Sequence, residues 1–118
     1  TIRVITMNIR GAFHSKIDDI AQVLQHHNCD IGILCETKTW KDSNTHSTIG
    51  SAFNRLGYTA YFNSIPKTQT KEPHEAKPRF PRRGIAILVR KDINNCLSNF
   101  EILEPGHLSS MDFTFGSV

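Results

Sequence analysis

The sequence predicts an α/β fold, because segments with strand-like and helix-like hydrophobic patterns alternate along its 118 residues. The first observation is the order strand, helix, strand within residues 1–35, which is that of a βαβ unit. The strands of such a unit run parallel and can be neighbours in one sheet. The second observation is residues 84–89, the most hydrophobic run of the chain, which is typical of a central strand.

Residue patterns predict the first strand, the helix and the second strand of the βαβ unit in turn. Residues 1–9 alternate loosely between apolar and polar side chains and predict the first strand. Ser15, with Asp18 three residues later, has capping-box spacing, so we expect the helix to begin at Ser15. One apolar stripe follows at helical spacing: Ile17, Ile20, Ala21 and Leu24. Asn28 tolerates a left-handed backbone and predicts the end of the helix, and residues 31–35 predict a strand buried on both faces.

Two polar side chains follow these two strands. Asn8 comes near the end of the first strand, and Glu36 directly follows the second. Ligands of α/β sheets gather at the carboxyl ends of strands, and parallel strands end at one edge. We therefore expect the Asn8 amide and the Glu36 carboxylate to converge within about 4–6 Å, the span of one metal's ligands. The alternative interpretation is that Glu36 is only the first solvated residue after a core strand.

Further elements complete the predicted sheet and its helices. A second helical stripe is closed by Gly57 and consists of Ile49, Ala52, Phe53 and Leu56. Residues 58–63 are rich in aromatic and β-branched side chains and predict a strand. Residues 97–103 predict a weaker strand, and the alternation over residues 111–115 predicts one more.

Length and composition indicate which class of protein this is. The length allows one small domain, and 38% hydrophobic residues is ordinary for a globular protein. No apolar run approaches the roughly 20 residues of a membrane span, and no basic-then-apolar leader is present, so we expect an intracellular protein without a membrane partner. Cys29, Cys35 and Cys96 are an odd number without C-x-x-C spacing, which predicts reduced, buried thiols and disfavours a zinc site.

The positive charge is concentrated in one segment. The net charge is +3, whereas residues 66–83 alone carry +4 and hold four of the five prolines, so we expect an exposed basic loop there. Arg79, Arg82 and Arg83 in this loop are candidate phosphate contacts for a nucleic acid. The alternative is a loop whose charges are simply solvated, and Phe80 is its only aromatic residue for base stacking.

Three motifs taken together resemble a known family. They are Met7-Asn8-Ile9-Arg10-Gly11, then Cys29-Asp30-Ile31-Gly32-Ile33-Leu34-Cys35-Glu36-Thr37-Lys38, then Arg83-Gly84-Ile85-Ala86-Ile87-Leu88-Val89. In this order and at this spacing they resemble the endonuclease/exonuclease/phosphatase superfamily, and within it the apurinic-type endonuclease domains of non-LTR retrotransposons. The resemblance covers nearly the whole chain and implies the first half of a two-sheet α/β sandwich, with helices on one face of a mixed sheet.

The resemblance implies roles for two residues, Asn8 and Glu36. The family asparagine that ends the first strand falls on Asn8, where it would help to bind a metal ion or the scissile phosphate. The family glutamate falls on Glu36, which would be a ligand of Mg²⁺ or Mn²⁺, and oxygen ligands suit such hard cations. Apart from the resemblance, Lys38 is a candidate contact to a phosphate oxygen because it lies just beyond Glu36, and the alternative is a solvated lysine.

The sequence departs from the family pattern in two respects. Arg10 stands where relatives in the DNA-repair branch often carry an aspartate, which puts a second acidic contact to the metal in doubt. The tyrosine, Asp-x-Asn and Ser-Asp-His motifs of the family's later half do not occur, so we expect residues 1–118 to be a partial domain whose remainder follows Val118. We then expect one face of the strand at 84–89 to lack a partner, and we interpret all six histidines as surface or loop residues: His14, His26, His27, His46, His74 and His107.

The implied function is metal-dependent phosphodiester hydrolysis, first of all DNA nicking by the endonuclease domain of a retroelement protein, which would be nuclear. The 118-residue chain by itself is expected to be inactive. Two alternatives stay open, a non-catalytic remnant or nucleic-acid-binding piece, and a phosphatase or phosphodiesterase of the same superfamily. DNA, RNA and a small phosphoester are not distinguished by the residues.

Overall fold

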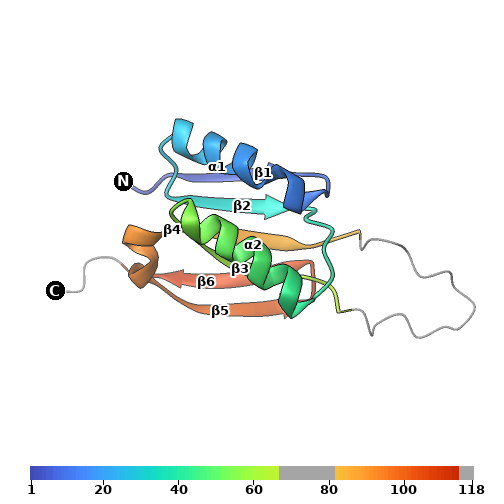
Figure 1. The fold of residues 1–118 in the computed structure, drawn as a ribbon. Helices are drawn as coiled ribbons and strands as arrows, with labels where there is room; N and C mark the ends of the chain where they lie inside the picture. The colour runs from blue at the N-terminus through green and yellow to red at the C-terminus, as the bar shows by residue number, and fades with distance from the viewer. Residues whose placement is uncertain (67–81, 115–118) are drawn as a thin grey trace, which may run out of the picture.

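A four-stranded mixed sheet with helices on one face forms the centre of the molecule (Figure 1). The computed structural model describes residues 1–66 and 82–114. The elements are β1 (Val4–Asn8), η1 (Phe13–Lys16), α1 (Ile17–His26), β2 (Ile31–Cys35), α2 (Ser43–Arg55), β3 (Tyr58–Asn63), β4 (Ile85–Arg90), η3 (Lys91–Cys96), β5 (Leu97–Glu104) and β6 (Leu108–Phe113). The predicted α/β class with a mixed sheet is confirmed.

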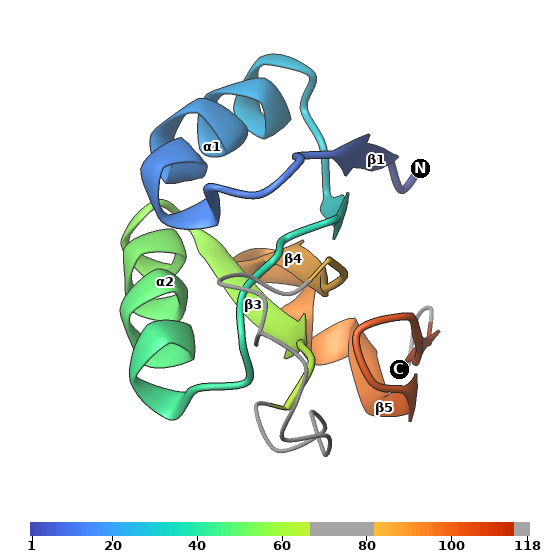
Figure 2. The same ribbon diagram turned by 90° about the vertical axis from the view of Figure 1, so that its right-hand side faces the viewer.

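The sheet has the strand order β1-β2-β4-β3, and β5 and β6 form a separate hairpin. β1 pairs with β2 in parallel, as the βαβ unit predicts, with Asn8 opposite Cys35. β4 pairs antiparallel with both β2 and β3, so the predicted central strand is central. α1 and α2 cover one face of this sheet, and the hairpin lies on the other (Figure 2).

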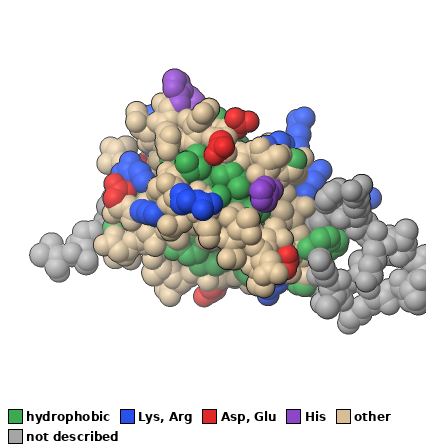
Figure 3. All heavy atoms as spheres, in the orientation of Figure 1, with side chains coloured by type: hydrophobic (Ala, Val, Ile, Leu, Met, Phe, Trp, Pro, Cys, Tyr) green, Lys and Arg blue, Asp and Glu red, His purple; other side chains and the backbone are tan. Residues whose placement is uncertain are grey.

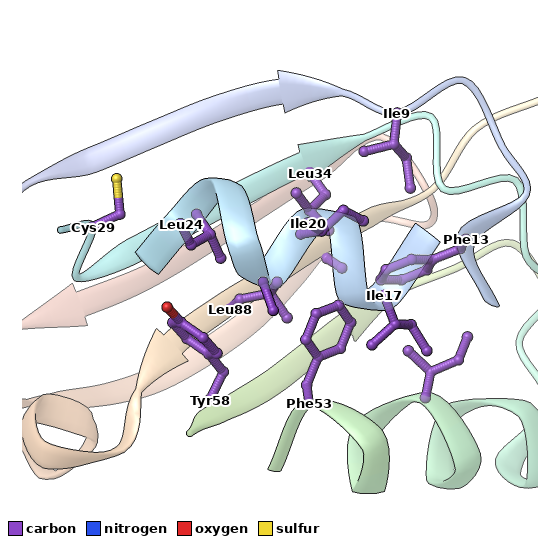
Figure 4. Close-up of a cluster of buried hydrophobic side chains, with 13 residues drawn as sticks. Ile9, Phe13, Ile17, Ile20, Leu24, Cys29, Leu34, Phe53, Tyr58 and Leu88 are labelled. Atoms are coloured by element: carbon purple, nitrogen blue, oxygen red, sulfur yellow. The ribbon is translucent and has the colours of Figure 1, made fainter. Parts of the chain in front are cut away.

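The main hydrophobic core lies between the helices and the sheet (Figure 4). Phe13, Leu24, Leu34, Phe53 and Leu88 are at most 1% exposed. The predicted stripe of α1 and the predicted residues Ile49 and Phe53 of α2 are all buried in this core. A Cβ at position 32 would lie 2.9 Å from Leu24 Cδ2, so glycine there allows α1 to approach β2 closely.

The opposite face of β4 is covered by a smaller core. Ile87 and Val89 are buried with Ile31, and Tyr61 of β3 packs on Phe100 of β5 with ring centroids 5.5 Å apart. The prediction that one face of β4 lacks a partner is therefore wrong, because β5 and η3 fold back across it.

Helix termini differ in part from the predictions. The expected capping box at Ser15 is wrong: α1 continues directly from η1, and Ser15 Oγ donates to the Ala12 carbonyl at 2.9 Å. Asn28 has the predicted left-handed backbone, with φ of 53°. Asp42 caps α2 by accepting from the Thr45 amide at 3.2 Å.

Within the described ranges, no helix has the length and apolar composition of a membrane-spanning segment.

The three cysteines are free thiols in unlike environments. Cys29 is buried, and burial raises the pKa of its thiol. Cys35 is exposed and Cys96 is half-buried, so the expectation that all three thiols are buried is wrong at these two residues. The expectation that β2 is buried on both faces over its whole length is wrong at Cys35. The reason is position: Cys35 is the last residue of β2, on the face of the sheet away from the helices and at the edge where the strand ends.

Candidate functional site

The ends of β1 and β2 form the edge at which the predicted site residues lie. The Ile9 amide donates to the Cys35 carbonyl at 3.0 Å, and the Gly11 amide donates to the Glu36 carbonyl at 2.7 Å. The backbones that carry Asn8 and Glu36 are thus joined side by side beyond the last strand pair. The start of β4 and the end of β3 reach the same edge, because those strands pair antiparallel.

Asn8 projects from the sheet face away from the helices. Its neighbours in β1, Ile5 and Met7, pack against the main core, whereas Asn8 is exposed. The Asn8 Oδ1 atom accepts a hydrogen bond from the Arg10 amide at 3.0 Å. A carbonyl oxygen has a second lone pair, so Oδ1 can also bind a cation, and Nδ2 can donate to an anion.

Glu36 lies in a short loop with an unusual backbone. Glu36 and Lys38 have φ of 54° and 53°, and in the facing loop Arg10 and Ala12 have φ of 56° and 52°. Left-handed backbone is uncommon for residues other than glycine, and such strain persists only where the surroundings hold it. Here the Lys38 amide donates to the Arg83 carbonyl at 3.1 Å, which ties this loop to the residues before β4.

A pocket of about 380 Å³ lies beside Glu36. It is lined by Cys35, Glu36, Arg82, Arg83, Gly84, Ile85, Gly106 and His107. Arg82 and Arg83 are exposed, so the structure places two of the predicted phosphate contacts in one pocket with the predicted metal ligand. In the described part of the chain, the Glu36 carboxylate forms no ion pair with either arginine. Figure 3 shows lysine and arginine side chains at this end of the molecule, on the right.

Lys38 lies apart from this pocket. Its side chain lines a second pocket of about 390 Å³ together with Phe13, Trp40 and other residues of the loop before α2. Its stem covers Gly11, where a Cβ would lie 3.0 Å from Lys38 Cδ. Lys38 therefore lines a different pocket from Arg82 and Arg83, although its backbone amide donates to the Arg83 carbonyl. Arg79 and most of the predicted basic loop 66–83 lie outside the described residues.

Thr37 lies between Glu36 and Lys38 and is buried. Its amide donates to the Gly84 carbonyl at 3.2 Å, and its Oγ1 atom has no hydrogen-bond partner among the described residues. A Cβ at Gly84, whose φ is +133°, would lie 2.1 Å from this oxygen. The contact requires glycine at position 84 and brings the start of β4 against the Glu36 loop.

Sequence reasoning missed His107 as a pocket residue. The prediction that it is a surface residue is consistent with the structure, in which it is exposed. Its place beside Glu36 depends on the β5–β6 turn, which is far along the chain from β2 and is held there by tertiary contacts. The signal in the sequence was only the Pro105-Gly106 pair, which is typical of a turn.

His46 differs from the predicted surface or loop histidine. It lies in α2, half-buried, and its ring stacks on Phe62 with centroids 4.4 Å apart. Its Nε2 atom is 2.9 Å from Ser64 Oγ. Burial lowers the pKa of His46, an effect that Asp42 opposes and Lys41 reinforces. The remaining described histidines, His14, His26, His27 and His107, are exposed, and His74 lies outside the described residues.

The donor set at this edge fits part of a site for a hard cation. One carboxylate and one amide oxygen are ligands that Mg²⁺ accepts, with water and phosphate completing its shell. Over residues 1–66 and 82–114, no cluster of three or more His, Cys, Asp or Glu side chains could hold a metal ion. The convergence of the Asn8 and Glu36 side chains on one cation stays a prediction.

Comparisons with known proteins give the family and the fold of this chain. The model of the endonuclease/exonuclease/phosphatase family matches residues 5–110. The fold is similar to that of an AP endonuclease from Archaeoglobus fulgidus, with a TM-score of 0.51 and 19% sequence identity over 75% of this chain and 27% of that chain. At this identity the likeness shows the fold alone, and this chain spans only about a quarter of that protein. A comparison with curated proteins finds no match.

The family match covers almost all of the chain, and the superfamily resemblance read from the three sequence motifs is thereby confirmed. Proteins of this family are nucleases and phosphatases, so phosphoester hydrolysis is the general chemistry of the family. The chain belongs to the endonuclease/exonuclease/phosphatase family.

Proposed function

We propose that this chain forms the metal-binding and phosphate-binding edge of a metal-dependent phosphodiesterase that nicks DNA. The observation that carries the proposal is the pocket that Glu36 shares with Arg82 and Arg83, beside the end of β1 that bears Asn8. One carboxylate with oxygen-donor neighbours suits a divalent cation, and two guanidinium groups suit a phosphate.

Each residue has a distinct task in this proposal. The Glu36 carboxylate and the Asn8 Oδ1 atom would hold Mg²⁺ or Mn²⁺, which when bound supplies charge stabilisation at a phosphate. Arg82 and Arg83 would hold phosphate oxygens and thereby orient the nucleic acid. Asn8 Nδ2 remains able to donate to a phosphate oxygen while Oδ1 accepts from the Arg10 amide. The left-handed backbone of Glu36, held by the hydrogen bonds of its loop to Gly11 and Arg83, would set the direction in which the Glu36 side chain leaves the backbone.

Cation binding tests the proposal without any need for turnover. Titration of the 118-residue chain with Mn²⁺, followed by water-proton relaxation, should reveal a site that Glu36→Gln weakens at least about tenfold, as expected when one of few charged ligands is lost. Glu101→Gln is the matched control, since Glu101 is an exposed glutamate of β5 outside the pocket. Equal Mn²⁺ affinity of the wild type and Glu36→Gln would remove Glu36 from the metal site.

We also propose that the 118-residue chain does not hydrolyse DNA at an enzymatic rate. A phosphodiester attacked by water needs a group that takes the proton, and such assistance contributes about 10²–10⁴-fold. Glu36 is the only carboxylate among the described residues that line this pocket, and the proposal assigns it to the cation. With Mg²⁺ and supercoiled or abasic DNA, this chain should leave the substrate intact. A protein that continues into Asp-x-Asn and Ser-Asp-His motifs should nick it. Nicking by the 118-residue chain that Glu36→Ala abolishes would contradict this.

The single carboxylate also favours a second candidate, a nucleic-acid-binding piece without catalysis. Binding of duplex DNA that is equally strong with Mg²⁺ and with EDTA, and that Glu36→Gln leaves unchanged, would support this candidate over the first. A superfamily phosphatase would instead bind a small phosphoester more tightly than DNA.

We further propose that the parent protein is the endonuclease of a non-LTR retroelement and acts in the nucleus. The three sequence motifs support this context, because within the superfamily they resemble the endonuclease domains of such elements. A reverse-transcriptase segment in the same polypeptide is the observation that would establish it.

A further inference from the structure

A single buried side chain holds the turn of the β5–β6 hairpin. The Asn63 side chain is fully buried at the end of β3. Its Nδ2 atom lies 3.0 Å from the Glu104 carbonyl, 3.0 Å from the Leu108 carbonyl and 2.8 Å from Ser109 Oγ. Its Oδ1 atom accepts from the Gly106 amide at 2.6 Å. One side-chain amide therefore forms hydrogen bonds with the last residue of β5, with the turn and with the first two residues of β6.

The turn is also fixed against the sheet edge. The Gly84 amide donates to the Gly106 carbonyl at 3.0 Å. Gly106 has φ of +69°, and a Cβ there would lie 2.5 Å from Ile65 Cγ1, so only glycine fits this position. The next residue, His107, donates its amide to the Glu104 carbonyl at 3.1 Å. The backbone of His107 is consequently held at the rim of the pocket that contains Glu36 and Arg83.

The chemistry of this rim suits an anion. Among the described residues, Glu36 is the only acid that lines the pocket, and Arg82, Arg83 and His107 are its potential donors to an anion. The His107 side chain is exposed and forms no hydrogen bond or ion pair with the described residues. An imidazole N–H can donate to a phosphate oxygen in either tautomer of the neutral ring.

We propose that His107 contacts a phosphate of the bound nucleic acid and that Asn63 is the positioning residue that places it there. The inference rests on the proposed function, because it assigns the phosphate-binding role of the same pocket. A buried hydrogen-bond network specifies one geometry, whereas an apolar contact tolerates sliding. The Asn63 network thus sets the distance between His107 and Arg83 across the pocket.

A purely structural role for Asn63 makes a different prediction. If Asn63 only stabilised the hairpin, its loss would lower the thermal stability but leave the DNA affinity of the folded protein unchanged. If it positions His107, its loss should weaken DNA binding to the extent that removal of the imidazole does. The effects of the two changes should then not add, because the second acts on a contact already lost.

The experiment is a double-mutant cycle measured by fluorescence anisotropy with a labelled duplex of about 20 base pairs. His107→Ala should weaken binding about five- to tenfold, the loss expected for one hydrogen bond to a charged group at an exposed site. Asn63→Ala should weaken it by a similar factor, and the double variant by no more than the larger single effect. His26→Ala and Asn99→Ala are matched controls, since both residues are exposed and outside this pocket, and neither should change the affinity.

Each outcome decides between the proposals. If the wild-type chain does not bind the duplex, the proposed function fails at this step. If it binds and His107→Ala leaves the affinity unchanged, only the present inference is overturned. Losses that multiply in the double variant would make Asn63 structural and overturn its positioning role. If Asn63→Ala does not fold by circular dichroism, Ser109→Ala replaces it, because it removes one of the hydrogen-bond partners of Asn63 Nδ2 without placing a charge near the pocket.

Discussion

Different interactions hold the elements that cover the two faces of the four-stranded sheet. On the helix-covered face, large side chains such as Phe13, Leu24 and Phe53 are at most 1% exposed, and the covering elements are held by apolar burial. On the hairpin-covered face, the buried cluster is small, and the hairpin turn is held by the polar Asn63 network. Val4 of β1 and Leu103 of β5 remain 48% and 51% exposed.

This difference between the two faces shows that folding stability and the positioning of the pocket residues have different physical sources. Apolar burial supplies most of the free energy of folding but is not directional. Hydrogen bonds add less net free energy but fix the geometry of the groups they join. The helix-covered face therefore carries the stability of the sheet, whereas the hairpin-covered face sets the geometry of the pocket that holds Glu36 and Arg83.

The largest expected effect breaks the helix-covered core. Phe53→Ala should lower the free energy of unfolding by about 3–5 kcal/mol, because it leaves a cavity in a fully buried site. Phe100→Ala on the hairpin-covered face, where the ring is only half-buried, should cost about 1–2 kcal/mol. Urea unfolding measures both, and equal losses would contradict the difference between the two faces.

Gly84 tests the close contact at the functional edge. Gly84→Ala should destabilise the protein by about 2–4 kcal/mol, because its Cβ would lie 2.1 Å from Thr37 Oγ1 at a strained φ. Gly57→Ala is the control, since Gly57 has φ of +99° but a Cβ there would have no described neighbour within 4 Å. It should cost about 1–2 kcal/mol from backbone strain alone. Thermal melts that rank Gly57→Ala as the worse variant would refute the steric explanation.

Loss of the Asn63 network should act on one face only. Asn63→Ala should cost about 2–3 kcal/mol, because it leaves the Gly106 amide without its buried partner. Hydrogen exchange should show lost protection in β5 and β6 while the amides of β1 and β2 keep theirs. Uniform loss of protection across all strands would mean that the hairpin and the sheet unfold as one unit.

A smaller effect should appear with pH at His46. Burial lowers the pKa of His46 in the folded state below the ordinary value of 6.5, so the unfolded chain takes up the proton first as the pH falls. The contribution of this group to stability is complete above about pH 6.5 and decreases as the pH falls through the folded pKa. Urea unfolding between about pH 7.5 and pH 5 should have a flatter pH dependence in His46→Gln. An unchanged dependence would exclude His46 as its source.

The smallest expected effect is on the free energy of unfolding at Thr37, where a substitution should not destabilise the protein. Thr37→Val should be neutral or stabilise the protein by up to about 1 kcal/mol, since it removes a buried hydroxyl that has no partner among the described residues. Thr39→Val removes a hydroxyl that lies 3.3 Å from Ser64 Oγ and should cost about 0.5–1 kcal/mol. Chemical denaturation measures the free energy of unfolding of both variants. A larger decrease for Thr37→Val than for Thr39→Val would show that the Thr37 hydroxyl has a partner.

The sequence by itself determined the elements whose signals are local. Periodicity identified the buried stripe of α1, the strand Tyr58–Asn63 and the central β4. The βαβ order placed Asn8 and Glu36 at one edge of the sheet, because a crossover helix makes its strands parallel. These features depend on side-chain patterns within a few residues, and such patterns can be recognised in a single sequence.

Only the tertiary structure decided where distant segments meet. The cap predicted at Ser15 did not form, because η1 runs directly into α1, and the half-buried position of His46 depends on Phe62 and Ser64. The pocket partner His107 was out of reach for the same reason: its position follows from hydrogen bonds between Asn63 and a turn more than 40 residues away. Contacts across such separations leave no periodic trace in the sequence, because each segment satisfies its own local pattern whichever partner it finds.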